Sequence, residues 1–311
     1  MRVAVVGAGL AGLAAARELV AGGHEAIVFE KSRGLGGRLA ARRVQGTVLD
    51  HGSRVVAAPA GSGLKELVDR LDVDDRVDLD EGIAFAGGAT RLPKLMSEGL
   101  DVRLGVRLAA LRSAAGGLEL GDEQGNTHGT VDAVVVSAPA PQAADLLERS
   151  PEGGDRVAAL RALAYRPAVM ILLGLRFAGL PEWDVLSAVD AALAEVRRES
   201  VKGRPPVDGV EPVVARMDPV ASEALIDASD EAVLAQALPG LADLGAGVPM
   251  WSQVKRWRYA VPLGHLDPAV INPPGVRIVV AGDSVTGADF DSSDHHRVYE
   301  SGILAARRVT A

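Results

Sequence analysis

The chain starts with a strand, a glycine motif and a helix, in an order that few folds accommodate. Residues 2–7 read RVAVVG, an apolar and β-branched run of the length of a buried parallel strand. An Ala- and Leu-rich segment at 10–20 predicts a helix, and residues 24–30 predict a second strand that ends in an acid. Between the first strand and the helix, a G-x-G-x-x-G pattern places Gly7, Gly9 and Gly12.

Each part of this unit has a physical role in holding a dinucleotide. Gly7 permits a tight turn, Gly9 lets backbone amides approach a pyrophosphate, and Gly12 lets the helix pack on the strand. The pyrophosphate lies at the positive N-terminus of the helix. Glu30, at the end of the second strand, accepts hydrogen bonds from ribose hydroxyls. The sequence therefore predicts a Rossmann-type, NAD(P)-binding kind of domain.

A second glycine group favours FAD over NAD as the bound dinucleotide. Residues 31–43 read KSRGLGGRLAARR, so Gly36, Gly37 and Arg38 follow soon after the ribose-binding acid. The two glycines leave their backbone amides accessible, and the arginine adds a guanidinium. Together these groups can make a second contact to a pyrophosphate. The chain has no further G-x-G-x-x-G pattern and no cysteine, which argues against the disulfide-reductase type of flavoprotein.

Composition excludes several other classes of function. The chain of 311 residues has no cysteine, which excludes disulfides, thiolate metal sites and thiol nucleophiles. Its net charge of −8 disfavours nucleic acid as the main partner. The six histidines show no metal-ligand spacing, so we expect no metal site.

With no apolar run long enough for a membrane span and no signal peptide, we expect a cytoplasmic protein. The oligomeric state is left open.

The C-terminal segment predicts a second part of the same site. Residues 276–281 (VRIVVA) read as a buried strand followed by Gly282 and Asp283, and a last helix runs from about 294 to 308. The Asp283 carboxylate can hold a ribitol hydroxyl. The helix start can place a positive dipole where negative charge develops on a flavin. Both ends of the chain are thus expected to form one FAD site.

Several stretches in order resemble a renalase-like FAD-dependent oxidoreductase of the flavin amine-oxidase superfamily. They include DHGS, SAPAPQA and RWRYAVP, the last two of which favour the renalase-like branch. The matching stretches are residues 3–43, 50–53, 134–147, 251–262 and 279–309.

The resemblance implies a set of cofactor-binding residues and a non-covalent FAD. The ADP half would be held by Gly7, Gly9, Gly12, Glu30, Gly36, Gly37 and Arg38. Val106, predicted to face inward on a strand at 101–111, would give a main-chain contact to adenine. The flavin half would be held by Gly52, Ser53, Gly282, Asp283, His296, Ser301 and Gly302.

The substrate side is less defined by the sequence. Trp257 and Tyr259 share a face of a predicted strand and would form a flat wall for a planar substrate, or simply pack in the core. Arg256 and Arg258 point the other way and are expected to be solvated or in salt bridges, but either one could hold an anionic substrate group if it turned into the cleft. His51 is either a flavin-edge contact or a structural turn residue.

The sequence departs from the family's pattern before the last helix. Residues 289–296 read DFDSSDHH, so that His295 and His296 replace the usual Val-Glu at the start of the helix. Histidines at this place could titrate near neutrality, cap the helix or belong to a surface loop. The departure leaves the substrate open.

We expect an α/β protein with a Rossmann-type FAD-binding domain and a second substrate domain of mixed or antiparallel sheet. The FAD domain is discontinuous and comprises residues 1–75, 100–145 and 275–311. The substrate domain comprises 76–99 and 146–274. The implied reaction is hydride transfer from a small dihydronicotinamide-type substrate to flavin N5, with dioxygen giving hydrogen peroxide.

Three other functions stay open at this point. An amine oxidase should present an aromatic pair and a lysine near the flavin, for which Lys94 is the candidate. A desaturase should present a long apolar tunnel. A non-catalytic FAD-binding protein should lack a cleft at the flavin face.

Overall fold

A five-stranded parallel sheet forms the base of the fold. The computed structural model describes residues 1–71, 73–177, 182–288 and 294–311. The strands lie in the order β17-β11-β1-β2-β7, and each neighbouring pair is parallel. Their bounds are β1 Arg2–Val6, β2 Glu25–Glu30, β7 Asp101–Leu104, β11 Ala133–Val136 and β17 Ile278–Val280.

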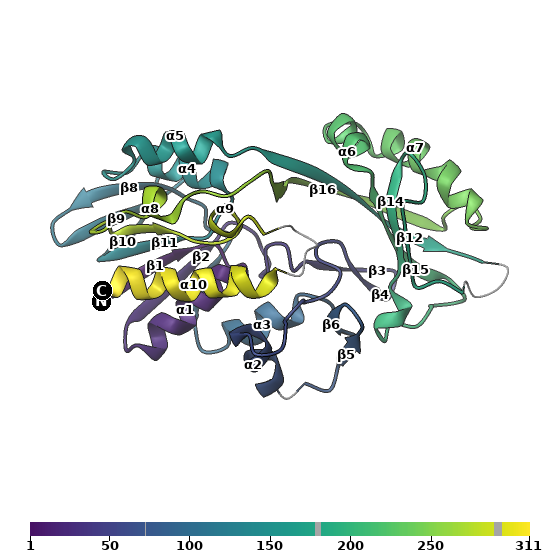
Figure 1. Ribbon diagram of the computed structural model, residues 1–311, viewed down its shortest axis with the longest axis horizontal. Coiled ribbons are helices and arrows are strands. Elements are labelled where there is room, and N and C mark those ends of the chain that lie inside the picture. Colours follow the sequence, from purple (N-terminus) through teal and green to yellow (C-terminus); the bar gives the residue numbers. More distant parts are fainter. Residues whose placement is uncertain (72, 178–181, 289–293) are drawn as a thin grey trace.

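Both faces of this sheet are buried, which explains why its strands read as continuous apolar runs. Val3 and Val5 belong to one core cluster and Ala4 to another, because successive side chains of a strand point to opposite faces. Helices α1 (Leu10–Ala21) and α10 (His295–Thr310) pack on the first face. They lie side by side beneath the sheet in Figure 1.

The second face carries two helices and a small antiparallel sheet. Helices α4 (Ala140–Glu148) and α5 (Gly154–Ala162) pack there through Leu147 and Leu160. The small sheet has the order β10-β9-β8. Its strands are β8 Leu108–Ala114, β9 Gly117–Asp122 and β10 Thr127–Val131.

Residues 63–97 add a layer next to α1. They form α2 (Gly63–Arg70), β5 (Arg76–Leu79), β6 (Gly82–Phe85) and α3 (Arg91–Ser97). Their apolar side chains join the α1 cluster, among them Phe85, Leu92 and Met96. The exact domain boundaries stay a prediction.

A second, antiparallel sheet forms the other half of the molecule (Figure 1). Its order is β13-β14-β15-β12-β16. The strands are β12 Tyr165–Leu175, β13 Val185–Ser187, β14 Leu193–Arg198, β15 Glu211–Met217 and β16 Trp251–Pro262. The long strand β16 runs back from this sheet toward the parallel one. The predicted α/β class, with a Rossmann-type domain and a second antiparallel sheet, is confirmed.

The two faces of the antiparallel sheet meet different partners. Helices α6 (Pro219–Leu225) and α7 (Asp230–Asp243) cover one face, where Ala221 and Val233 join the core. The other face packs on the hairpin of β3 (Ala41–Val44) and β4 (Thr47–Asp50). This hairpin follows directly from the FAD-type glycine segment, so it joins the two halves.

One predicted strand is wrong. The segment 101–111 was expected to be a single strand with Val106 facing inward, but it is split between β7 and β8, which belong to different sheets. Gly105 adopts φ +71°, a left-handed conformation that ends the first strand. Val106 therefore lies in the connection. Within the described residues, no helix combines the length and apolar character needed to cross a bilayer.

Helices α1 and α10 approach so closely that only glycine fits at their crossing. A Cβ atom placed on Gly302 would lie 2.0 Å from the Ala11 carbonyl oxygen. Gly302 was predicted to belong to the flavin half of the site, and the structure places it between these two helices. Its contact brings the start of α10 to the end of the parallel sheet.

We expect Gly302→Ala to destabilise the protein by about 2 kcal/mol, because the added methyl forces the helices apart. Helix propensity alone would predict the opposite sign, a gain of about 1 kcal/mol. Urea unfolding of the variant measures the difference. Leu304→Ala, on the exposed side of the same helix, is the control and should change stability by no more than about 0.5 kcal/mol.

Candidate functional site

A large cavity opens at the carboxyl ends of the parallel strands. Its volume is about 1100 Å³, and its lining comes from both halves of the molecule. Val6 and Phe29 mark the ends of β1 and β2, and Ser137 follows β11. Strand β16 supplies the opposite wall through Trp257 and Tyr259. Ligand sites of open α/β sheets lie at this edge.

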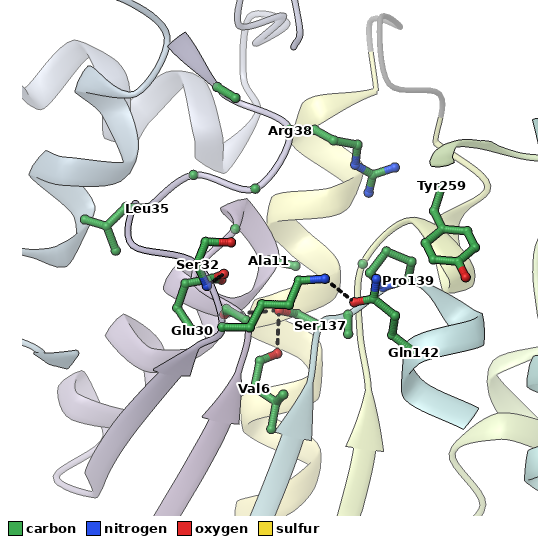
Figure 2. Close-up of a pocket in the computed structure, with 18 of the residues that line it drawn as sticks. Val6, Ala11, Glu30, Ser32, Leu35, Arg38, Ser137, Pro139, Gln142 and Tyr259 are labelled. Atoms are coloured by element: carbon green, nitrogen blue, oxygen red, sulfur yellow. Dashed lines mark hydrogen bonds between the residues drawn. The ribbon is translucent and has the colours of Figure 1, made fainter. Parts of the chain in front are cut away.

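The Glu30 carboxylate is fixed at one end of the cavity by backbone amides. Its Oε2 accepts a hydrogen bond from Ala8 N at 2.9 Å, and its Oε1 accepts one from Ser32 N at 2.8 Å. Figure 2 shows Glu30 beside Ser32 at the end of its strand. Val106 N donates to the Glu30 carbonyl at 3.0 Å, which brings the connection between β7 and β8 to the same end.

Two side-chain contacts hold the rim of this end together. The Ser137 hydroxyl donates to the Val6 carbonyl at 3.0 Å. Lys31 Nζ donates to Gln142 Oε1 at 2.9 Å, and both residues line the cavity. Burial lowers the pKa of Lys31, with a contribution from the nearby charge of Arg107.

Arg38 joins the glycine segment to the C-terminal strand. Its Nη1 donates to Asp283 Oδ2 at 2.9 Å and to the Ala260 carbonyl at 3.0 Å. Figure 2 shows Arg38 extending from its loop toward the side on which Tyr259 lies. Asp283 is 1% exposed, and its Oδ1 has no hydrogen-bond partner among the described residues. This buried acceptor is suited to a ligand hydroxyl.

The turn at 50–53 is tied to the start of α10 by His295. Ala57 N donates to His295 Nδ1 at 3.2 Å, so Nδ1 is the unprotonated nitrogen. The proton of the neutral ring is therefore on Nε2, which lies 3.1 Å from Ser53 Oγ. Burial and the nearby charge of Arg38 lower the pKa of His295 to about 4. His295 is neutral at physiological pH.

A flat wall of two stacked rings lies opposite the glycine segment. The His51 and Trp257 rings have centroids 5.5 Å apart and an interplanar angle of 23°. Trp257 Nε1 donates to the His51 carbonyl at 2.7 Å, which fixes the indole. Burial and nearby cations lower the pKa of His51 to about 4. Tyr259 meets Tyr165 edge to face, with centroids 5.6 Å apart.

Behind this wall, a buried ionic network joins the two halves. Asp50 Oδ2 accepts from Lys202 Nζ at 3.1 Å and from Arg204 Nη2 at 2.8 Å. Lys202 also pairs with Glu199 at 2.9 Å, and Arg204 pairs with Glu199 as well. Arg197 Nη2 donates to the Asp50 carbonyl at 2.6 Å. Burial alone would raise the pKa of Asp50, but the Lys202 and Arg204 charges hold it below its usual value.

Comparison with models of known protein families shows the family to which this chain belongs. Residues 77–310 match the family described as flavin containing amine oxidoreductase, and residues 5–71 match the NAD(P)-binding Rossmann-like domain. The chain belongs to the flavin containing amine oxidoreductase family. Membership identifies the cofactor as FAD and the class of chemistry as flavin-dependent oxidoreduction.

Individual relatives resemble parts or all of the chain. A 4,4'-diapophytoene desaturase of Staphylococcus haemolyticus is 46% identical over 59 residues, which cover 19% of this chain and only 12% of the relative. An engineered putrescine oxidase has a TM-score of 0.73 at 14% identity, with 99% of this chain and 98% of that chain covered. A fatty acid isomerase from P. acnes has the same TM-score at 12% identity, covering 100% and 99%. These two structures show a shared fold.

The residues present fit FAD. The amide-bound Glu30 and the glycine segment line the cavity. Asp283, whose Oδ1 has no hydrogen-bond partner among the described residues, directly follows the lining residue Gly282. The N-terminus of α10 reaches the cavity through His295 and Val298 and directs its positive end there.

The predicted site residues fall into two groups by position. Those in the cavity lining are Gly7, Gly9, Glu30, Gly36, Gly37, Arg38, Ser53, Val106, Trp257, Tyr259 and Gly282. Those outside the lining are Gly12, Gly52, Asp283, His296, Ser301 and Gly302. Ser301 Oγ accepts from Gly282 N at 3.0 Å and so holds the strand end.

Sequence reasoning named His296 as the cofactor contact, but His295 lines the cavity. The difference is one helix position, and α10 begins at His295 with that side chain turned inward. The preceding residues 289–293 of the predicted departure lie outside the described residues. Arg256 and Arg258 form the predicted salt bridges, with Asp230 at 2.6 Å and Asp227 at 2.5 Å, and both also line the cavity.

We expect Lys202→Met to lower the free energy of unfolding by about 3 kcal/mol, because it leaves the buried Asp50 and Glu199 carboxylates short of a cation. Urea unfolding and the retained flavin content measure the effect. Lys94→Met removes an exposed lysine and should cost no more than about 0.5 kcal/mol. Equal losses in both variants would contradict a special role for the network.

The two histidines with lowered pKa predict a loss of stability in weak acid. Between pH 6.5 and 4, the unfolded chain binds a proton at each ring and the folded chain does not, so stability falls as the pH falls. His51 and His295 each contribute up to about 1.4 kcal/mol per pH unit in this window. Urea unfolding at several pH values measures the slope.

His295→Asn tests the assignment, because the amide oxygen can replace Nδ1 as the acceptor without titrating. We expect this variant to show a shallower dependence on pH. His265→Asn, at an exposed histidine, should keep the dependence of the original protein. An unchanged slope in the His295 variant would show that this ring does not carry the effect.

Proposed function

We propose that the protein is an FAD-dependent oxidase that takes a hydride from a small planar substrate of the dihydronicotinamide type. The observation that carries this proposal is the stacked His51–Trp257 wall of the cavity, since a planar ring can lie against it. When bound, FAD accepts the hydride and passes both electrons to dioxygen, which with one proton gives hydrogen peroxide.

The groups beside this wall suit a substrate that needs no general base. His51 has a pKa of about 4 and is therefore a weak base at neutral pH. Arg42 also lines the cavity, and its guanidinium is a donor of hydrogen bonds with no acceptor. A dihydronicotinamide is already a hydride donor, so its oxidation requires binding and orientation but no proton abstraction. Trp257 supplies the orientation, and its hydrogen bond to the His51 carbonyl keeps the indole in place.

Amine oxidation is the second candidate. The aromatic pair of Trp257 and Tyr259 in the cavity wall and the family membership support it. Lys94, the expected partner of a flavin in such an enzyme, is an exposed residue of α3 and is outside the cavity lining. Desaturation is the third candidate, because it belongs to the same class of flavin chemistry and 59 residues of this chain match a 4,4'-diapophytoene desaturase.

The proposal predicts that anaerobic mixing with a dihydronicotinamide isomer bleaches the flavin absorbance of the purified protein. Trp257→Leu should retain the flavin and raise the apparent dissociation constant for that substrate about tenfold, through loss of ring stacking. Stopped-flow absorbance measures both, and admission of air should restore the band with release of peroxide. Bleaching by amines alone would replace this proposal with the second candidate.

A further inference from the structure

The β3–β4 hairpin carries a cation on the face that meets the antiparallel sheet. Arg42 of β3 pairs with Leu49 of β4, and side chains of directly opposed residues lie on the same face of a hairpin. Leu49 is fully buried against Met170 of β12. Arg42 therefore projects on the side of the sheet and lines the cavity together with His51 and Trp257.

A second cation lies on the facing strand. Lys255 of β16 is opposite Met170, the residue that packs near Leu49. Lys255 and Trp257 are two positions apart in the same strand, so both side chains are on the face that meets the hairpin. Lys255 is half-buried, and burial and the Arg42 charge lower its pKa. Both cations also act on His51.

These two cations differ from the arginines on the opposite face of β16. Arg256 and Arg258 also line the cavity, but each is paired with a carboxylate, Asp230 and Asp227 respectively. In the part of the chain that the structure describes, neither Arg42 nor Lys255 has an ion pair or a side-chain hydrogen bond. Arg42 lines the cavity, and Lys255, on which the charge of Asp230 also acts, lies just outside the lining on the same face as Trp257. Together the two cations give this edge of the stacked-ring wall a positive potential.

We propose that Arg42 and Lys255 form a subsite for an anionic group of the substrate, a phosphate or a carboxylate, next to the ring bound at the His51–Trp257 wall. The inference rests on the proposed function and narrows it to substrates that carry such a group. Arg42 offers a planar fork of donors and Lys255 a point charge, which together suit an oxyanion. An uncharged dihydronicotinamide of the same ring would bind more weakly.

Ligands that cannot be oxidised test the subsite without turnover. The probes are matched pairs added to the holoenzyme: nicotinamide mononucleotide against nicotinamide riboside for phosphate, and benzoate against benzamide for carboxylate. Perturbation of the flavin absorbance reports binding. We expect the charged member of at least one pair to bind about tenfold more tightly, and added salt to reduce the preference. The pair that shows it identifies the anion.

The double variant Arg42→Met and Lys255→Met should bind both members of a pair with equal affinity while keeping its flavin. Arg43→Met is the matched control, because Arg43 is next to Arg42 but pairs with Val48 and points to the opposite face. It should keep the preference. Equal affinity within both pairs in the original protein, or a preference kept in the double variant, would overturn the subsite.

This experiment separates the subsite from the reaction. A charge preference that depends on Arg42 and Lys255, together with a flavin that no dihydronicotinamide reduces, would support the subsite and reject the proposed function. Flavin reduction at equal rates and affinities by charged and uncharged dihydronicotinamides would support the function and reject the subsite.

Discussion

The contact between Asp50 and the cations Lys202 and Arg204 holds the two halves of the molecule in one geometry. Asp50 ends the hairpin that leaves the nucleotide-binding unit, and the cations belong to the segment that follows β14 of the second sheet. A deeply buried charge is costly unless it is paired. Moving the two halves apart would leave the buried carboxylate and cations without their partners, so the network opposes that motion. Because the turn 50–53 carries His51 and Ser53, the network also fixes one wall of the cavity.

The cavity depends on this arrangement because its two ends are formed by different halves of the molecule. The end at Glu30 is formed by short local segments, while the end at which we propose that the substrate binds is formed by β16. Trp257 bonds to the His51 carbonyl, and Arg38 bonds to the Ala260 carbonyl. These two hydrogen bonds span the boundary and set the distance between the wall and the glycine segment.

The sequence predicted best what is encoded locally. The first strand, its glycines and Glu30 lie within 30 residues, and their spacing alone determines their geometry. The ionic network was missed because Asp50 and Lys202 are far apart in the chain and nothing local marks either as buried. His295 was missed in favour of its neighbour because a shift of one residue turns a helical side chain by about 100°. The strand expected at 101–111 failed because Gly105 ends it.

The close crossing of Gly302 with Ala11 means that the first and last helices must find each other across almost the whole chain. During synthesis, domains fold from the N-terminal side as the chain emerges from the ribosome. The glycine motif is then available early, but Asp283, His295 and the helix that supports them appear last. Until residues 283–310 have been synthesised, a nascent chain has only part of its dinucleotide site, so cofactor capture follows the synthesis of α10.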